Sequence, residues 1–204
     1  MLEDLKEVDV LGSWLKDERL FDKCLINVKK LNLELLSPYF SGEPWSKALT
    51  GKKVLVVHPF AEQIEMQYIK REMLFRNPDI LPEFQLSTIK AVQSLGGDCD
   101  DFPDWFAALD YMKAEIDKSD YDICLIGAGA YGFPLAAHIK RMGKKAVHLG
   151  GSLQLLFGIK GKRWEDPNYN AQYNYASLMN IHWIYPDKES RPKNADKVEG
   201  ACYW

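Results

Sequence analysis

The stretch YDICLIGAGAYG, residues 121–132, decides the fold class of this chain. Its first half, Tyr121–Ile126, is apolar except for Asp122 and is of the kind that forms a buried strand. Its second half, Gly127–Gly132, matches Gly-x-Gly-x-x-Gly, and a helical pattern over Phe133–Met142 follows it. A glycine-rich turn between a strand and a helix is typical of Rossmann-type folds, so the stretch predicts a fold of this type.

Strands and helices alternate on both sides of this stretch. The sequence predicts strands at Lys53–Val57, Glu83–Val92 and Lys145–Leu149, and helices at Ala61–Phe75 and from Pro103 onward. The apolar stripe expected on the second of these helices consists of Phe106, Leu109, Met112 and Ile116. Such alternation implies parallel strands joined by crossover helices. We therefore predict a three-layer, Rossmann-like α/β fold with a mostly parallel sheet and helices on both faces.

The 204 residues suffice for one α/β domain, of which residues 51–163 form the predicted core. Residues 1–50 are predicted to be a helical or irregular segment, in which Val10–Leu15 also fits a strand. Residues 164–204 are rich in aromatic side chains, Asn and Pro. They are predicted to wrap around the same domain, with one short helix at Ala171–Met179. Hydrophobic residues make up 47% of the chain, which is typical of a globular protein.

Charge and cysteine usage exclude several classes of protein. The net charge of −3 argues against non-specific nucleic-acid binding, which requires clustered positive charge. No apolar run is long enough for a membrane helix, and no signal peptide is recognisable. The four cysteines share no Cys-x-x-Cys spacing, so neither a zinc site nor a redox motif is indicated; they are Cys24, Cys99, Cys124 and Cys202. We expect a cytoplasmic protein with reduced thiols.

The window Ile123–Trp164 contains no Asp or Glu, but it contains seven Lys or Arg residues. A dinucleotide-binding fold normally carries an acidic residue about 20 residues after its glycine turn, where this residue binds the ribose hydroxyls. The corresponding strand of this chain ends in Val147–Ser152, which has no acid. We therefore expect no NAD cofactor and favour an anionic ligand held by its phosphates. An NADP or S-adenosylmethionine enzyme is a weaker alternative.

A second glycine turn, Gly150-Gly151-Ser152, also joins a predicted strand to a predicted helix, Leu153–Phe157. Both turns follow strands, so we expect them at the carboxyl edge of the sheet, where open α/β sheets bind ligands. Glycines and helix N-termini let the backbone approach a phosphate and donate N–H groups to it. We predict a two-sided diphosphate cradle formed by Gly127, Gly129, Tyr131, Gly132, Gly150, Gly151, Ser152, Lys160 and Arg163. The alternative is a pair of tight turns that bind no ligand.

Two of the four histidines, His58 and His148, stand where predicted strands end. We expect them near the same edge of the sheet, as acid or base groups or as further phosphate contacts. The alternative for each is a loop histidine that forms hydrogen bonds only with protein. His138 lies within the predicted helix Phe133–Met142 and is expected to be structural.

Three acidic triplets have the spacing of metal-binding motifs: Asp98-Cys99-Asp100, Asp120-Tyr121-Asp122 and Asp187-Lys188-Glu189. Such triplets are common by chance. Asp100 lies near a predicted helix start, where a carboxylate offsets the helix dipole without a metal. Asp120 and Asp122 precede a strand and are expected at the edge opposite the glycine turns. We therefore assign no metal ligand from the sequence.

The segment Tyr121–Trp164 resembles the GT-D-type glycosyltransferases, most clearly over Gly127–Gly132 and His148–Ser152. The resemblance implies a variant Rossmann-like fold that transfers glucose or another sugar from a nucleotide-sugar donor to a glycan or glycoprotein acceptor, with Mn²⁺ or Mg²⁺ as a cofactor. That family carries a Gly-Asp-Gly-Glu segment whose acids serve the metal and the donor, and residues 1–50 contain no such segment. We therefore expect glycosyltransferase-like binding of a nucleotide-sugar. The alternative is a non-catalytic nucleotide- or phosphate-binding module.

Overall fold

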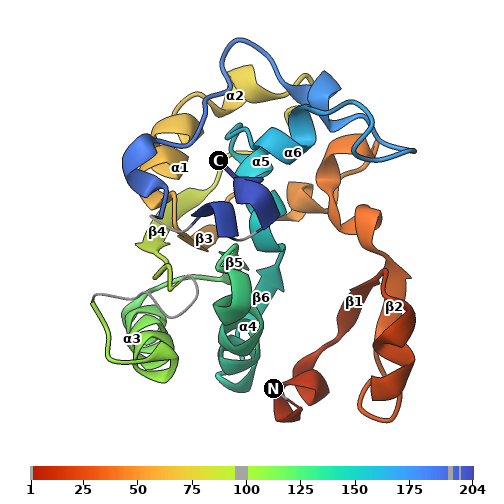
Figure 1. Cartoon of the computed structure of the whole chain (residues 1–204), viewed down its shortest axis with the longest axis vertical. Coiled ribbons are helices and arrows are strands. Elements are labelled where there is room, and N and C mark those ends of the chain that lie inside the picture. The colour runs from red at the N-terminus through yellow and green to blue at the C-terminus, as the bar shows by residue number, and fades with distance from the viewer. Residues whose placement is uncertain (1, 95–100, 193–194, 198) are drawn as a thin grey trace.

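The computed structural model describes residues 2–94, 101–192, 195–197 and 199–204. At its centre, four parallel strands form one sheet in the order β4–β3–β5–β6 (Figure 1). These strands are β3 (Lys53–His58), β4 (Gln85–Lys90), β5 (Ile123–Ile126) and β6 (Lys145–His148). The chain passes from β3 to β4 on one side and then crosses to β5 on the other side of β3. The strand order therefore reverses between β3 and β5.

Helices cover both faces of this sheet. They are α1 (Ala61–Tyr68), α2 (Arg71–Leu74), α3 (Trp105–Lys118), α4 (Gly132–Arg141), α5 (Leu153–Leu156) and α6 (Lys162–Glu165). Val54 and Val56 of β3 belong to one core cluster, together with Ile64 of α1. Leu55 and Val57 belong to a second cluster, which contains the buried residues of α3 and α4. Alternate residues of one strand thus pack on opposite faces, and the predicted three-layer fold is confirmed (Figure 1).

Helix α3 shows how the local sequence sets its boundaries and its buried face. It begins after Asp104, whose side chain accepts a hydrogen bond from the Ala107 N–H at 2.8 Å, as an N-cap residue should. Its buried residues are Ala108, Leu109, Met112 and Ile116. The prediction that Phe106 belongs to this face is wrong, because its side chain is 69% exposed. Phe106 lies about 100° around the helix from the centre of the buried face.

Two other predicted helices are wrong in their extent. The helix predicted over Ala61–Phe75 is divided into α1, which ends at Tyr68, and α2 (Arg71–Leu74). Between them the Lys70 N–H bonds to the carbonyl only three residues back, which tightens the last turn of α1. The helix predicted over Ala171–Met179 is reduced to a 3₁₀ turn at Tyr175–Leu178. There the Asn170 side chain accepts hydrogen bonds from two following N–H groups, which replaces helical bonding with a local turn.

The N-terminal segment contains a separate, two-stranded parallel sheet, β1 (Val10–Ser13) and β2 (Lys29–Asn32). Its other elements are 3₁₀-helices at Glu3–Glu7, Lys16–Phe21, Leu33–Leu36, Pro38–Phe40 and Trp45–Leu49. The alternative prediction of a strand in Val10–Leu15 is correct, because β1 lies there. No strand was predicted at β2. Arg141 at the end of α4 pairs with Asp4 at 2.7 Å and with Glu7 at 3.1 Å. Arg141 is one of the seven Lys or Arg residues of the window Ile123–Trp164, and it therefore binds the N-terminal segment.

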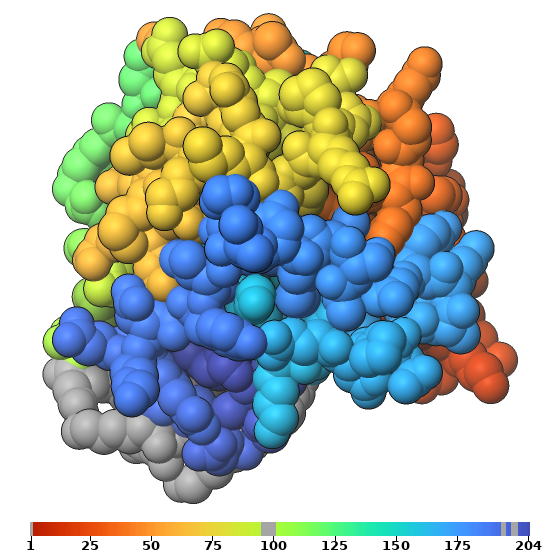
Figure 2. All heavy atoms as spheres, turned by 90° about the horizontal axis from the view of Figure 1, so that it is seen from above, coloured from red at the N-terminus to blue at the C-terminus, as the bar shows by residue number. Residues whose placement is uncertain are grey.

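The C-terminal segment lies across the domain and is held by aromatic side chains. In Figure 2 it covers the face next to α1 and α2. Its Trp183 indole donates to the Leu74 carbonyl at 3.1 Å, and its Trp204 indole donates to the Ser190 carbonyl at 3.2 Å. Further 3₁₀ turns occur at Lys188–Ser190, Ala195–Lys197 and Glu199–Ala201. Among the described residues, no helix has both the length and the apolar character needed to cross a membrane.

Candidate functional site

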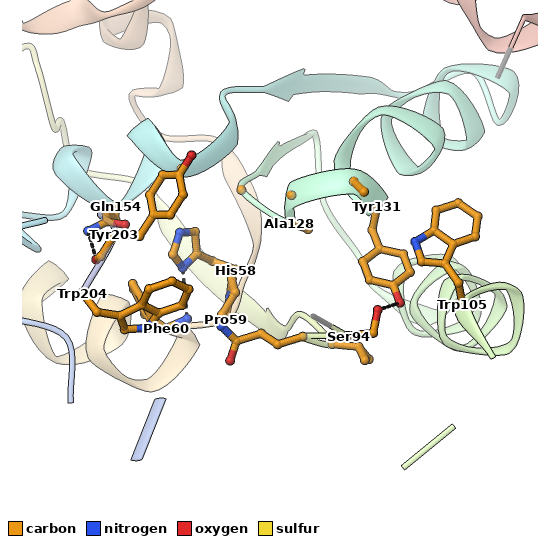
Figure 3. A pocket seen from close by; sticks show the side chains of 16 residues that line it. His58, Pro59, Phe60, Ser94, Trp105, Ala128, Tyr131, Gln154, Tyr203 and Trp204 are labelled. Carbon is orange, nitrogen blue, oxygen red and sulfur yellow. Dashed lines mark hydrogen bonds between the residues drawn. The ribbon is translucent and has the colours of Figure 1, made fainter. Parts of the chain in front are cut away.

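A cavity of about 370 Å³ opens at the carboxyl ends of β3 and β5 (Figure 3). This is the point at which the strand order reverses, and open α/β sheets bind ligands there. Its volume is within the usual range for small-molecule sites. The described residues that line it are His58, Pro59, Phe60, Val92, Gln93, Ser94, Trp105, Gly127, Ala128, Gly129, Ala130, Tyr131, Gly151, Gln154, Tyr203 and Trp204.

The loop after β5 presents unpaired backbone N–H groups at this cavity. Gly129 has a φ of +52°, a left-handed conformation that glycine adopts without steric cost, and a 3₁₀ turn over Gly129–Tyr131 leads directly into α4. Within the described part of the chain, the N–H groups of Ala128, Gly129 and Ala130 have no hydrogen-bond partner. Helix α1 also begins beside the cavity, directly after Phe60. Unpaired N–H groups and the positive ends of two helix dipoles favour an anionic group here.

Aromatic side chains form two facing sides of the cavity (Figure 3). On one side, Trp105 and Tyr131 stack with their ring centres 5.0 Å apart and their planes within 8°, and the Tyr131 hydroxyl is hydrogen-bonded to Ser94. The other side is formed by His58, Phe60, Tyr203 and Trp204. Aromatic faces of this kind suit a planar ring or the apolar face of a sugar.

His58 is buried and has a fixed ring orientation. It is 2% exposed, and its Nδ1 accepts a hydrogen bond from the Phe60 N–H at 3.0 Å. Burial lowers the pKa of His58 to about 3, so the ring is neutral near pH 7. Because Nδ1 is an acceptor, the proton of the neutral ring is on Nε2. A ring in this state can donate a hydrogen bond through Nε2–H, and its low pKa makes it a poor general base.

His148, in contrast, does not line the cavity. Its Nδ1 lies 3.2 Å from the Ile126 carbonyl, and its ring packs on Gly132, where a Cβ atom would be only 2.1 Å from Cε1. Burial lowers the pKa of His148 as well. The third glycine of the loop therefore allows close packing between β6 and α4, and His148 fits the structural alternative.

Two further glycines of the predicted cradle accommodate side chains of the protein. A Cβ atom on Gly127 would be 2.5 Å from the His58 ring, and a Cβ atom on Gly151 would be 2.0 Å from the Tyr203 ring. Both glycines line the cavity, whereas Gly150 and Ser152 do not. The Ser152 hydroxyl donates to the Leu149 carbonyl at 2.7 Å. The second glycine turn therefore holds the C-terminal segment against the cavity.

The two cations predicted to neutralise a diphosphate also lie outside the lining. The Lys160 ammonium is 4.7 Å from the centre of the Tyr185 ring. The Arg163 guanidinium is 4.8 Å from the centre of the Tyr203 ring, and it contacts the Tyr203 hydroxyl at 3.4 Å. None of the described lining residues is Lys, Arg, Asp or Glu. The backbone N–H groups of the loop are therefore the groups of the described lining that best suit an anion.

The described residues do not fit a protein-held Mn²⁺ or Mg²⁺ ion. Among them, no group of three His, Cys, Asp or Glu side chains is close enough to share a metal. Asp122 accepts a hydrogen bond from the Lys53 N–H at 2.8 Å, and Asp120 pairs with the Lys53 side chain, both at the amino end of β3. The predicted triplet Asp98-Cys99-Asp100 lies outside the described residues.

Several lining residues were not predicted from the sequence, among them Phe60, Trp105, Gln154, Tyr203 and Trp204. Phe60 follows β3 and Trp105 begins α3, so a search of every strand end and helix start would have found both. Gln154 donates to the Lys160 carbonyl at 2.7 Å and to the Tyr203 carbonyl at 3.2 Å, which fixes its amide group. Tyr203 and Trp204 are distant in sequence from the loop, and no local pattern signals their position.

Comparison of this chain with models of protein families, with curated proteins and with solved structures finds no significant match. The resemblance to the GT-D-type glycosyltransferases therefore stays a prediction.

Proposed function

We propose that this chain binds a nucleotide in the cavity between β3 and β5, and that a nucleoside-diphosphate sugar is the ligand. The observation that carries the proposal is the placement of three unpaired N–H groups, those of Ala128, Gly129 and Ala130, at a cavity on the strand-order reversal. Such groups at the start of a helix favour phosphate oxygens. A phosphate at this loop would lie between the two aromatic sides of the cavity.

The rest of the lining favours a nucleotide over a simple anion. It is mainly aromatic and apolar, and its polar side chains include His58, Gln93, Ser94 and Gln154. A planar base provides the apolar surface that such walls bind, and its edge provides partners for the polar groups. Among the described residues of the lining there is no carboxylate of the kind that binds the ribose hydroxyls of NAD in Rossmann folds, which supports a ligand other than NAD.

Transfer of the sugar to a glycan or glycoprotein acceptor is the second part of the proposal. Its support is the family resemblance over Gly127–Gly132 and His148–Ser152. The described lining offers no carboxylate for proton transfer, and the low pKa of His58 makes it a weak base, so the chemistry of the cavity supports binding more strongly than catalysis. A binding module without turnover is the alternative, and a donor-hydrolysis assay separates the two.

Calorimetric titration of the purified chain tests the binding proposal. The panel contains UDP-glucose, other nucleotide-sugars, UDP, NAD(P) and S-adenosylmethionine, each with and without Mn²⁺. We expect one nucleotide-sugar, together with its nucleoside diphosphate, to bind in preference to NAD(P) and S-adenosylmethionine. Binding of S-adenosylmethionine or NAD(P) alone, or no binding by any member of the panel, would contradict the proposal.

A pair of glycine variants connects this binding to the loop. Gly129→Val places a branched side chain at a φ of +52°, and Gly143→Val does the same at +76° at the end of α4, away from the cavity. Neither new Cβ atom would meet another atom within 4 Å, so both variants introduce backbone strain without a collision at Cβ. We expect both to lose a similar amount of stability, of order 1–2 kcal/mol. Only Gly129→Val should also lose at least tenfold in affinity for the nucleotide-sugar. Equal affinities of the two variants would show that the loop does not contact the ligand.

A further inference from the structure

We infer that His58 determines ligand specificity as a hydrogen-bond donor: its Nε2–H group binds an acceptor atom of the ligand. This inference rests on the proposed binding function. Of the roles predicted from the sequence, it replaces the acid or base role of His58 with that of a hydrogen-bonding contact to the ligand. It also describes the ligand: the group that faces His58 has an oxygen or nitrogen lone pair.

The orientation of the ring is set by residues next to His58. The Phe60 N–H donates to Nδ1 at 3.0 Å, and the Phe60 ring lies 4.9 Å from the imidazole, centre to centre. On another side, a Cβ atom on Gly127 would be 2.5 Å from Cδ2 and 3.1 Å from Nε2, so glycine at this position lets the imidazole lie against the loop backbone. The ring therefore has little room to turn over and exchange its two nitrogens.

The Nε2–H group is the part of His58 that remains for a ligand. His58 lines the cavity, and within the described part of the chain its Nε2 has no hydrogen-bond partner. Among the described residues, Nε2 is not one of the buried side-chain atoms that lack a partner, so water reaches it in the ligand-free protein. A ligand that displaced this water without supplying an acceptor would leave the N–H group unpaired, which raises the free energy of the complex. The donor thus favours ligands that place a lone pair at this position.

The charge state of His58 follows from its surroundings. Burial is the cause of its lowered pKa, and no charged neighbour contributes. The other titratable side chains of the described lining are the phenols of Tyr131 and Tyr203. An ordinary histidine changes its charge near pH 6.5. Because His58 stays neutral there, the ligand affinity should not change around this pH.

Two substitutions separate the two nitrogens of the ring. In His58→Asn, the side-chain oxygen is as many bonds from Cβ as Nδ1 is, so it can accept from the Phe60 N–H, but the Nε2 donor is lost. In His58→Gln, the amide nitrogen is as many bonds from Cβ as Nε2 is, so a donor is kept and the Nδ1 acceptor is lost. We expect His58→Asn to bind UDP-glucose about tenfold more weakly with nearly unchanged stability. We expect His58→Gln to bind within about threefold of the wild type and to be the less stable variant.

The affinity difference between these two variants separates ligand binding from a purely structural role, and the pH dependence and the ring tautomer test the state of the ring that the inference requires. The UDP-glucose affinity of the wild type should be constant between pH 5.5 and 8, and long-range ¹H–¹⁵N spectra of the ligand-free protein should show a neutral, Nε2-protonated ring for His58. Unchanged affinity in His58→Asn, or an Nδ1-protonated ring, would overturn the inference about His58 alone. Failure of the wild type to bind UDP-glucose or any other nucleotide would overturn the proposed function and this inference together.

Discussion

A methyl group added at Gly151 would collide with the Tyr203 ring. The Cβ atom of Gly151→Ala would lie 2.0 Å from Cε1 and 2.5 Å from Cδ1 of Tyr203, well inside the contact distance of about 3.5–4.0 Å between carbon atoms. Tyr203 has little freedom to retreat, because its carbonyl accepts from Gln154 at 3.2 Å and its ring packs against Trp164. Overpacking of this kind costs about 1–3 kcal/mol of unfolding free energy.

The same substitution should be almost harmless once the ring is removed. Gly151 has no positive φ, so alanine fits its backbone, and in the Tyr203→Ala background we expect Gly151→Ala to cost less than about 0.5 kcal/mol. The two substitutions should therefore be coupled by at least about 1 kcal/mol. Urea unfolding of the wild type, both single variants and the double variant, followed by circular dichroism, measures this coupling. Gly42→Ala is the control, because its Cβ atom would have open space around it.

An equal cost of Gly151→Ala in both backgrounds would refute this reasoning. It would mean that Tyr203 does not lie on the second glycine turn in solution, and Tyr203 would then no longer form one side of the cavity.

Three further predictions concern pH, helix capping and the surface cations. Because the pKa of His58 is about 3 in the folded chain and near 6.5 when unfolded, the unfolded state binds the extra proton between these values. Stability should therefore fall as the pH drops from 6.5 toward 3, with His58 contributing up to about 1.4 kcal/mol per pH unit; an unchanged slope in His58→Asn would contradict this. Asp104→Ala removes the N-cap of α3 and should cost about 1 kcal/mol in urea unfolding, whereas Asp104→Ser should recover most of it. Lys160→Gln should change the UDP-glucose affinity by no more than about twofold in calorimetry, because Lys160 lies on the Tyr185 ring outside the lining. A tenfold loss would show that Lys160 contacts the ligand.

The features predicted correctly from the sequence depend on residues close together in the chain. The strand Val54–Val57 is at most 1% exposed, and its apolar run identifies it without any tertiary information. The turn Gly127–Gly132 lies between a strand and a helix, as its spacing predicts. The short strands β1 and β2 gave weaker signals, because most residues of β2 are exposed and it lacks an alternating apolar pattern.

The composition of the cavity was harder to predict, because it depends on contacts between distant parts of the chain. The sequence identified five lining residues: His58, Gly127, Gly129, Tyr131 and Gly151. It also selected Lys160 and Arg163 for their charge, although aromatic rings of the C-terminal segment hold both cations outside the lining. Which side chain fills the space beside a glycine, such as Tyr203 at Gly151, is a property of the folded chain alone.

The most direct test of the central claim is a ¹H–¹⁵N correlation spectrum of the chain, recorded during titration with UDP-glucose and, separately, with UDP. We predict that the largest shift changes occur at the backbone amides of Ala128, Gly129 and Ala130, and at the indole N–H signals of Trp105 and Trp204. Changes confined to the neighbourhood of Lys160 and Arg163, or no changes at saturating ligand, would contradict a nucleotide site at the reversal of strand order.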